Sequence, residues 1–329
     1  MFSIRKIAIL LGLSLLPALC SAEPRGGKLL AEGKIDQATS LLQMQVREAP
    51  NDAESYHLLC RAYFSLGNWD QAISNCERAT ALEPGNSQYH MWLGRGYGEK
   101  AASSSFMNAL SLAKRVRVEF ETAVRTDSKN VEARTDLAEF YLEAPGIVGG
   151  GRDKAQAQAR ILAAQDPGKA DWVYGRLAEK RKDSVAAENY YRAAVQVSHG
   201  SADAWFNLAL FYRHGGRLND MQEAIRRASS SEALQPAVFV EAADVLIRAG
   251  RDFPLSRDLL TRYLSQNFGR EISVAFKAHY LLGTLLERQG DKQSAGHEYR
   301  MALSLAGGFS PAQKALERIG PELVSFSAQ

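Results

Sequence analysis

The sequence has little of what most enzymes and metalloproteins need. It contains three cysteines and six histidines in 329 residues, and no histidine has a second ligand at the close spacing of a metal site. The motifs of zinc peptidases and serine hydrolases are missing, and no cysteine has a partnering histidine. These absences favour a protein without a metal, a cofactor or a catalytic centre.

An excess of charge of one sign is lacking as well. The formal net charge is +3, and it falls to +1 once Arg5 and Lys6 are removed. Nucleic-acid binding depends on Lys and Arg side chains that neutralise phosphates. A nearly neutral chain therefore gives no electrostatic reason to expect a nucleic-acid partner.

Long apolar runs are confined to the start of the chain. Arg5 and Lys6 precede an apolar run over residues 7–16, and small residues follow at 21–22. This order is typical of a secretory signal peptide. No later stretch approaches the ~20 apolar residues that a transmembrane helix needs. We therefore expect cleavage after Ala22 and export to the periplasm or the medium.

The cysteines leave two questions open. A lipoprotein would be acylated on Cys20, but the preceding residue in such proteins is normally small and here it is Leu19. After cleavage only Cys60 and Cys76 remain, one on each expected helix of the same sequence unit. An oxidising compartment permits a disulfide between them, and two separate buried thiols are the alternative.

What the sequence does contain is a repeat of 34 residues. Within the unit 53–86, apolar residues recur at helical spacing in two short segments, which predicts two amphipathic helices back to back. Neither helix can bury its apolar face alone, so the copies must stack. Pairs of like residues 34 positions apart are Gly33 and Gly67, Ala38 and Ala72, Pro50 and Pro84, Leu59 and Leu93, and Tyr63 and Tyr97.

Small residues recur at one site of the first helix in each unit. A small side chain there lets the two helices of a unit approach closely, while large aromatic residues fill the gaps between units. The residues at this site are Gly94, Ala138, Gly175, Ala209, Ala243 and Gly283.

The clearest copy of the unit carries Trp205, Leu208, Ala209, Tyr212 and Gly216. This pattern resembles the tetratricopeptide repeat, and repeats three and four together resemble a segment of exported bacterial proteins of that family. The resemblance implies an all-α, right-handed superhelical solenoid. It implies about eight antiparallel helix-pair repeats and a C-terminal capping helix.

We expect the solenoid to span residues 23–309 after the signal peptide 1–22, with a capping helix at 310–320 and a flexible tail at 321–329. Repeat three is about ten residues longer than the others, and its extra segment at 101–114 predicts longer helices that project past the stack. The expected repeats are 23–52, 53–86, 87–130, 131–167, 168–201, 202–235, 236–275 and 276–309.

Repeat four contains a glycine-rich insertion at 145–151. Its backbone amides could bind an anion at the start of the next helix. No phosphate-loop pattern is completed there, however, so a rigid turn is the favoured interpretation. An enzyme that uses this insertion is the weakest of the functional hypotheses.

The resemblance implies an exported scaffold, not an enzyme, that binds a protein or an extended peptide segment in a concave groove lined by the first helices. The alternative is a structural subunit or assembly factor of an envelope, pilus or export complex that docks through the extended repeat three. The groove residues implied by the resemblance are His57, Arg61, Met91, Arg95, Trp172, Arg176, Phe206, Arg213 and Tyr280.

Three arginines occupy the same site of repeats two, three and five: Arg61, Arg95 and Arg176. Stacking converts equal sites into a row in space, so we expect these guanidinium groups to face carboxylates of a bound segment. Alternatively, Glu139 and Glu143 pair with the arginines in the free protein and leave a self-neutralised surface.

Overall fold

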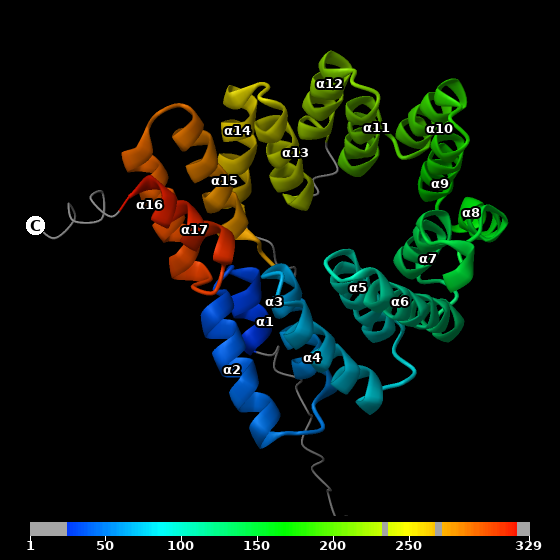
Figure 1. The fold of residues 1–329 in the computed structure, drawn as a ribbon, viewed down its shortest axis with the longest axis horizontal. Coiled ribbons are helices and arrows are strands. Elements are labelled where there is room, and N and C mark those ends of the chain that lie inside the picture. Colours follow the sequence, from blue (N-terminus) through cyan, green and yellow to red (C-terminus); the bar gives the residue numbers. More distant parts are fainter. Residues whose placement is uncertain (1–24, 232–235, 267–271, 321–329) are drawn as a thin grey trace, which may run out of the picture.

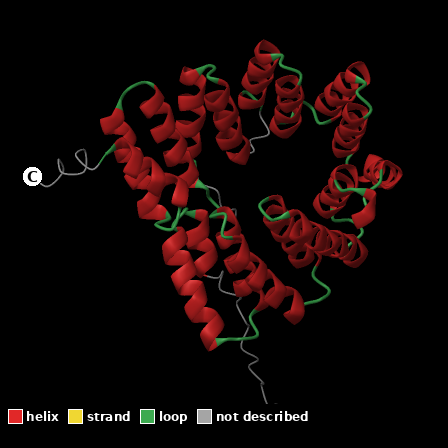
Figure 2. Cartoon of the chain, in the orientation of Figure 1, coloured by secondary structure: helices red, strands yellow, loops and turns green. Residues whose placement is uncertain are grey.

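The computed structural model describes residues 25–231, 236–266 and 272–320. The expected signal peptide and the expected C-terminal tail lie outside these residues. In the described part of the chain, all regular secondary structure is helical, and loops without any strand join the helices (Figure 2). None of its helices is both long enough and apolar enough to cross a membrane.

Successive helices form eight antiparallel pairs in the described residues, and one further helix, α17 (Ser310–Ile319), follows the last pair. The all-α repeat solenoid expected from the sequence is thus confirmed. The first helices of the pairs are α1 (Arg25–Ala31), α3 (Ala53–Ser65), α5 (Ser87–Ala102), α7 (Val131–Glu143), α9 (Pro167–Lys180), α11 (Ala202–His214), α13 (Pro236–Ala249) and α15 (Ala275–Arg288). The second helices are α2 (Ile35–Glu48), α4 (Trp69–Leu82), α6 (Phe106–Thr126), α8 (Arg152–Gln165), α10 (Ser184–Val197), α12 (Leu218–Ser229), α14 (Phe253–Leu264) and α16 (Lys292–Leu305).

Local sequence explains where the helices begin and turn back. The carboxylate of Asp52 accepts a hydrogen bond from the backbone amide of Ser55 at 3.1 Å, which caps the N-terminus of α3. Between the helices of several pairs, a glycine adopts positive φ, for example +75° at Gly67. Glycine reaches this backbone conformation without the steric cost that a side chain imposes.

The small residues in the first helices work as the sequence indicated. A Cβ on Gly94 would lie 2.5 Å from the ring of Phe120, and a Cβ on Gly283 would lie 2.5 Å from the ring of Tyr299. Each aromatic ring from the second helix therefore rests directly on the backbone of the first helix. A larger residue at either glycine would force the two helices apart.

Repeat three has the long helices that the sequence predicted. Helix α5 has 16 residues and α6 has 21, whereas the helices of the other complete pairs have 12 to 14. The end of the α5 and α6 hairpin points toward the middle of the molecule (Figures 1 and 2). The two apolar residues at the start of α6, Phe106 and Met107, are 74% and 73% exposed.

The glycine-rich insertion is a rigid turn. It begins with the short 3-10 helix η1 (Gly146–Val148), in which Val148 is buried. The backbone amides of Gly150 and Gly151 donate hydrogen bonds to Pro145 O and Tyr141 O at 3.2 and 2.8 Å. These amides are already used within the protein, which disfavours the anion-binding alternative.

The stacked repeats curve into a ring (Figure 1). The first helices lie on the inner side of the ring and most of the second helices lie on the outside. The C-terminal helices α16 and α17 lie next to the N-terminal helices α1 and α2, so the two ends of the solenoid meet.

Candidate functional site

The inner side of the ring does not expose all of the predicted groove residues. Met91 is 0% exposed, Phe206 is 5% exposed and His57 is 8% exposed. Each lies early in a first helix, and Met91 and Phe206 belong to the apolar core. His57 stacks on Tyr89 of the next repeat with the ring centres 4.7 Å apart. The structure thus places these three side chains in the packing between helices and not on the open inner surface, and their contact with a partner stays a prediction.

The predicted groove residues that lie about one helical turn after these three buried positions are half-buried and face the inner side. The guanidinium carbon of Arg61 lies 4.9 Å from the ring centre of Trp92, and that of Arg95 lies at the same distance. Trp92 thus links the two arginines through cation–π contacts, which are worth roughly 0.5 to 2 kcal/mol each. A similar contact of 5.5 Å joins Arg176 to Trp172.

Carboxylates of α7 hold two of the arginines. Arg95 Nε donates to Asp136 Oδ2 at 2.6 Å, and Arg176 contacts Glu139 and Glu143 at 3.1 and 2.6 Å. Of the two sequence-based alternatives, the structure favours the surface that neutralises itself. We call this set of inner-side arginines, tryptophans and carboxylates on α3, α5, α7 and α9 the inner ladder.

The carboxylates of the ladder differ in how strongly they hold their charge. Burial raises the pKa of Glu139, and the nearby Arg176 offsets only part of this effect. At Glu143, burial also disfavours the charged form, but hydrogen bonds from Lys180 and Arg176 overcome it and lower the pKa. Both side chains contact Arg176, so acidic and basic side chains alternate along the ladder.

A cavity of about 260 Å³ lies beside Trp172, between α9 and α11. Lys169 and Asp203 form an ion pair of 2.5 Å at its wall, and Asn207 adds an amide. Pockets for small-molecule ligands usually measure about 300 to 1,000 Å³. This cavity is smaller than that range and suits a single side chain.

The remaining predicted groove residues lie apart from the inner ladder. Arg213 is half-buried near the end of α11. Tyr280 is half-buried on α15 and packs against Tyr299 and Phe309, with ring centres 5.9 and 5.5 Å apart. The structure therefore does not bring these two residues together with the arginine row.

Sequence reasoning missed two charged residues of the inner side, Glu241 on α13 and Lys277 on α15. Burial lowers the pKa of Lys277 and raises the pKa of Glu241, and the two side chains influence each other. Glu99, near the end of the repeat-three hairpin, also acts on Lys277. These residues occupy different sites of their repeats, so the 34-residue period gave no signal for them.

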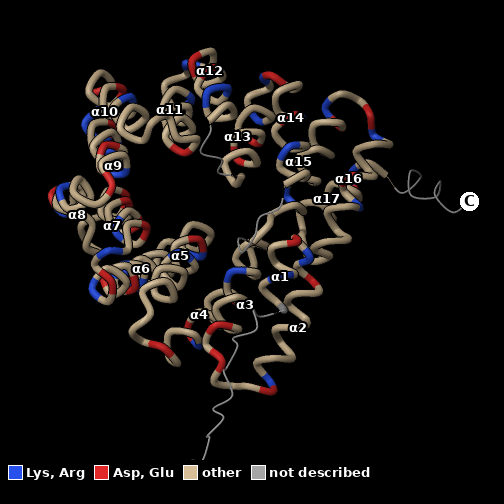
Figure 3. Tube along the Cα trace, turned by 180° about the vertical axis from the view of Figure 1, so that it is seen from behind, with Lys and Arg blue, Asp and Glu red and all other residues tan. Residues whose placement is uncertain are grey.

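Charges of both signs are interspersed along the helices (Figure 3). Within the described residues, no group of three or more His, Cys, Asp or Glu side chains could hold a metal ion.

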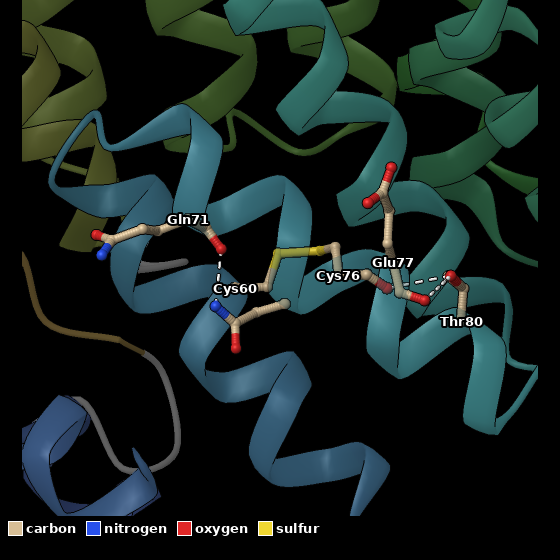
Figure 4. Close-up of a disulfide and its surroundings, with 6 residues drawn as sticks. Cys60, Gln71, Cys76, Glu77 and Thr80 are labelled. Atoms are coloured by element: carbon tan, nitrogen blue, oxygen red, sulfur yellow. Dashed lines mark hydrogen bonds between the residues drawn. A yellow bond between two sulfur atoms is a disulfide. The ribbon is translucent and has the colours of Figure 1, made fainter. Parts of the chain in front are cut away.

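The two cysteines that remain after the expected cleavage are joined in the structure. Cys60 on α3 and Cys76 on α4 form a disulfide with their Cα atoms 5.2 Å apart (Figure 4). Both residues are wholly buried. The bond links the two helices of repeat two, which carries Arg61 of the inner ladder.

Family models described as tetratricopeptide repeat match residues 29–95, 202–233 and 240–311, together about half of the chain. Among solved structures, yeast Tom70 is similar with a TM-score of 0.51 and 14% identity, over 88% of this chain and 61% of that one. TTC0263, a repeat protein of the same kind from Thermus thermophilus, gives a TM-score of 0.47 and 20% identity, over 57% of this chain and 95% of that one. The likeness to Tom70 shows the fold alone.

Curated relatives are similar over part of the chain. The human protein O-mannosyl-transferase TMTC3 is 24% identical over 193 residues, which is 57% of this chain and 20% of the human protein. The mouse protein of the same name is 24% identical over 178 residues, 53% of this chain and 19% of the mouse protein. The chain spans about a fifth of the length of these relatives.

Proposed function

Because the chain belongs to the tetratricopeptide repeat superfamily, whose stacked helix pairs present extended concave surfaces for binding, we propose that it is an exported scaffold. It binds an extended segment of another protein along the inner ladder. The observation that carries this proposal is the pair of half-buried tryptophans on the inner side, Trp92 and Trp172, with arginines stacked on both.

The ion pairs of the inner ladder limit which peptide segments can bind there with useful affinity. An acidic side chain that binds Arg95 or Arg176 replaces a carboxylate of the protein, so one ion pair is exchanged for another with little net gain. Affinity must therefore come from apolar contacts with the tryptophans and the cavity beside Trp172, since aromatic residues dominate binding energies. The favoured segment carries charges of both signs and one apolar side chain that fills the cavity.

Peptides selected from a random phage-displayed library on the immobilised protein provide a probe for this proposal. We expect the Trp172→Ala variant to weaken the Kd of a selected peptide by about tenfold or more, because a buried aromatic contact is lost. The matched control is Trp205→Ala, a half-buried tryptophan of α11 that lies beside Gly200 and outside the ladder. Failure to enrich any peptide, or equal Kd values for the two variants, would contradict binding at the inner ladder.

A second candidate function is docking through repeat three, as part of an envelope, pilus or export complex. It is favoured by the exposed Phe106 and Met107 and by the segment 101–113, which contains no charged residue. Exposed apolar groups of this kind often mark interaction sites. A peptide that binds Trp172→Ala normally but not a Phe106→Ser, Met107→Ser double variant would favour this candidate.

Export is the part of the proposal that rests on the N-terminal sequence. Arg5 and Lys6, the apolar run after them and the small residues at 21–22 support it, and the buried disulfide suits an oxidising compartment. N-terminal sequencing of the protein recovered from cells is expected to begin at Glu23. An uncleaved N-terminus, or a lipid on Cys20, would show that the export route is different.

No catalytic step is part of the proposal. The similarity to a transferase covers a fifth of that protein at 24% identity, and the amides of the glycine-rich insertion are engaged in its own turn. We therefore assign binding, not catalysis, to the inner side of the ring.

A further inference from the structure

The first and last repeats meet at one side of the ring (Figure 1). The turn at residues 32–34, between α1 and α2, lies against the segment 272–275 that leads into α15. The start of α2 lies against the segment 306–309 that follows α16. We call this contact the seam.

Two backbone amides of the last repeat donate hydrogen bonds across the seam. Ser273 N donates to Leu30 O at 2.9 Å, and Gly307 N donates to Asp36 Oδ2 at 2.7 Å. Ser273 is buried, and a buried amide left without a partner is costly, whereas the bond to Asp36 is exposed. The first and last repeats thus supply matching donors and acceptors across the seam.

The chain ends also approach closely at Gly33, which has a φ of +73°. A Cβ at this position would lie 3.1 Å from the Cβ of Ala275. Glycine suits both the backbone conformation and the lack of space. A side chain as large as that of arginine on either residue would press the two repeats apart.

Apolar side chains from both ends of the chain share one core behind these contacts. Leu30 and Ile35 from the first repeat are buried in it together with Phe276 and Phe309 from the last. Removal of apolar surface from water stabilises such a contact by roughly 25 cal/mol for each Å². The shared core therefore favours the closed ring.

The seam is nevertheless made differently from the contacts between successive repeats. Neighbouring repeats pack helix against helix, as α4 does against α5. The hydrogen bonds of the seam instead join two loop segments of the last repeat to the last turn of α1 and the first turn of α2. Parts of a protein with few contacts open at a lower free energy than the whole molecule unfolds. Opening the seam exposes the shared core and breaks these two hydrogen bonds, but it breaks no hydrogen bond within a helix. The seam can therefore open without the loss of any helix.

We propose that the seam is a latch, which opens while the eight repeats stay folded and admits a partner segment to the inner ladder from the side. The admission of a partner rests on the proposed function, and the opening does not. A segment flanked by folded domains cannot thread through a closed ring. The latch therefore fits a partner whose bound segment lies within a longer chain and not at a free end.

Hydrogen exchange tests the opening without any ligand. In the Ala275→Arg variant, the amide of Ser273 is expected to exchange about tenfold faster than in the wild type, the factor for losing roughly one net hydrogen bond and its packing. Small-angle X-ray scattering is expected to give a larger radius of gyration, with unchanged helicity. The matched control, Ala237→Arg, places the same change on an exposed residue in the first turn of α13.

Two results would overturn the latch. In the wild type, the amide of Ser273 could exchange as slowly as the amides in the middle of α11, which would mean that the seam opens only when the whole protein unfolds. In the Ala275→Arg variant, exchange and scattering could both match the wild type, which would mean that the contact at Gly33 does not close the ring.

A second variant locks the seam and tests lateral entry. Gly33→Cys combined with Ala275→Cys places two Cβ atoms about 3.1 Å apart, slightly closer than the usual separation of roughly 3.5 to 4.5 Å in a disulfide. The positive φ of residue 33 strains the new side chain in both redox forms, so the oxidised and reduced forms of this one variant are compared. The probe is a library-selected peptide fused at both ends to a folded reporter protein. We expect oxidation of the variant to slow association of this probe at least tenfold, and reduction to restore it.

The wild type treated with the same reductant shows how much of the change comes from Cys60 and Cys76. The same peptide with free ends should bind the locked ring, because it can thread. Equal association rates of the double fusion with the locked and reduced rings would overturn lateral entry. If the library yields no peptide, the proposed function fails, and hydrogen exchange still decides whether the latch opens.

Discussion

Replacing both Cys60 and Cys76 by alanine is expected to lower the free energy of unfolding by about 3 kcal/mol. The disulfide joins residues with a sequence separation of 16, and the chain-entropy relation gives roughly 3 kcal/mol for a loop of this size. Both residues are wholly buried, so the cavities left by the missing sulfurs add to the loss. Urea unfolding, followed by far-ultraviolet circular dichroism, measures the difference.

The oxidised wild type treated with reductant is the matched control, because it loses the bond and keeps the sulfur atoms. Its stability should fall between those of the oxidised wild type and the double variant. Thiols counted in denatured, unreduced protein without residues 1–22 report the bond directly. Two free thiols per chain, or equal stabilities of the double variant and the oxidised wild type, would contradict this prediction.

The second large effect is a loss of stability in mild acid that depends on His57. Burial, with a smaller contribution from Arg61, lowers the pKa of His57 from 6.5 to about 3. Nδ1 of this ring is buried and has no hydrogen-bond partner among the described residues. The folded protein therefore holds His57 neutral, whereas the unfolded chain takes up a proton as the pH falls below about 6.5.

Because the folded-state pKa is the lower one, the stabilising contribution is complete above pH ~6.5 and declines toward pH ~3. Linkage gives a loss of about 2 kcal/mol between pH 7 and pH 5. We expect the His57→Phe variant, which keeps a ring against Tyr89, to lack this part of the pH dependence. Urea unfolding at the two pH values measures it for both proteins.

His90 is an internal reference for this comparison. A hydrogen bond to Glu119 raises its pKa, so its stabilising contribution is present at low pH and is lost as the pH rises. This opposite trend is common to the wild type and the variant and cancels in their difference. If the two proteins lose equal stability between pH 7 and pH 5, His57 is not the group responsible.

The repeat period was enough to predict the helix pairs and the long hairpin of repeat three. Each pair depends on contacts within one unit or with the next unit, such as the close packing of Gly94 against Phe120. Such contacts repeat at a fixed spacing in the sequence. The period also predicted the partnership of Cys60 with Cys76 as one of two alternatives, since both belong to one unit.

The surface of the inner side was harder to predict, because exposure depends on the angle between successive repeats. Met91 and Phe206 are buried in the core, and Arg95 and Arg176 lie within reach of α7. The arginines are paired and half-buried. Replacing them by glutamate would therefore leave carboxylates of α7 facing a like charge, and stability would fall by more than the ~0.5 kcal/mol usual for an exposed site. The sequence alone did not reveal this cost.

The seam also limits how the chain can change in length. In an open solenoid each repeat contacts only its neighbours, so units can be gained or lost without disturbing distant ones. Here Gly307 bonds to Asp36, which lies 271 residues earlier, and that bond exists only when the stack turns far enough to bring its ends together. Insertion or deletion of one 34-residue unit would move the last repeat away from the first. The meeting of the two ends therefore ties this protein to its present number of repeats.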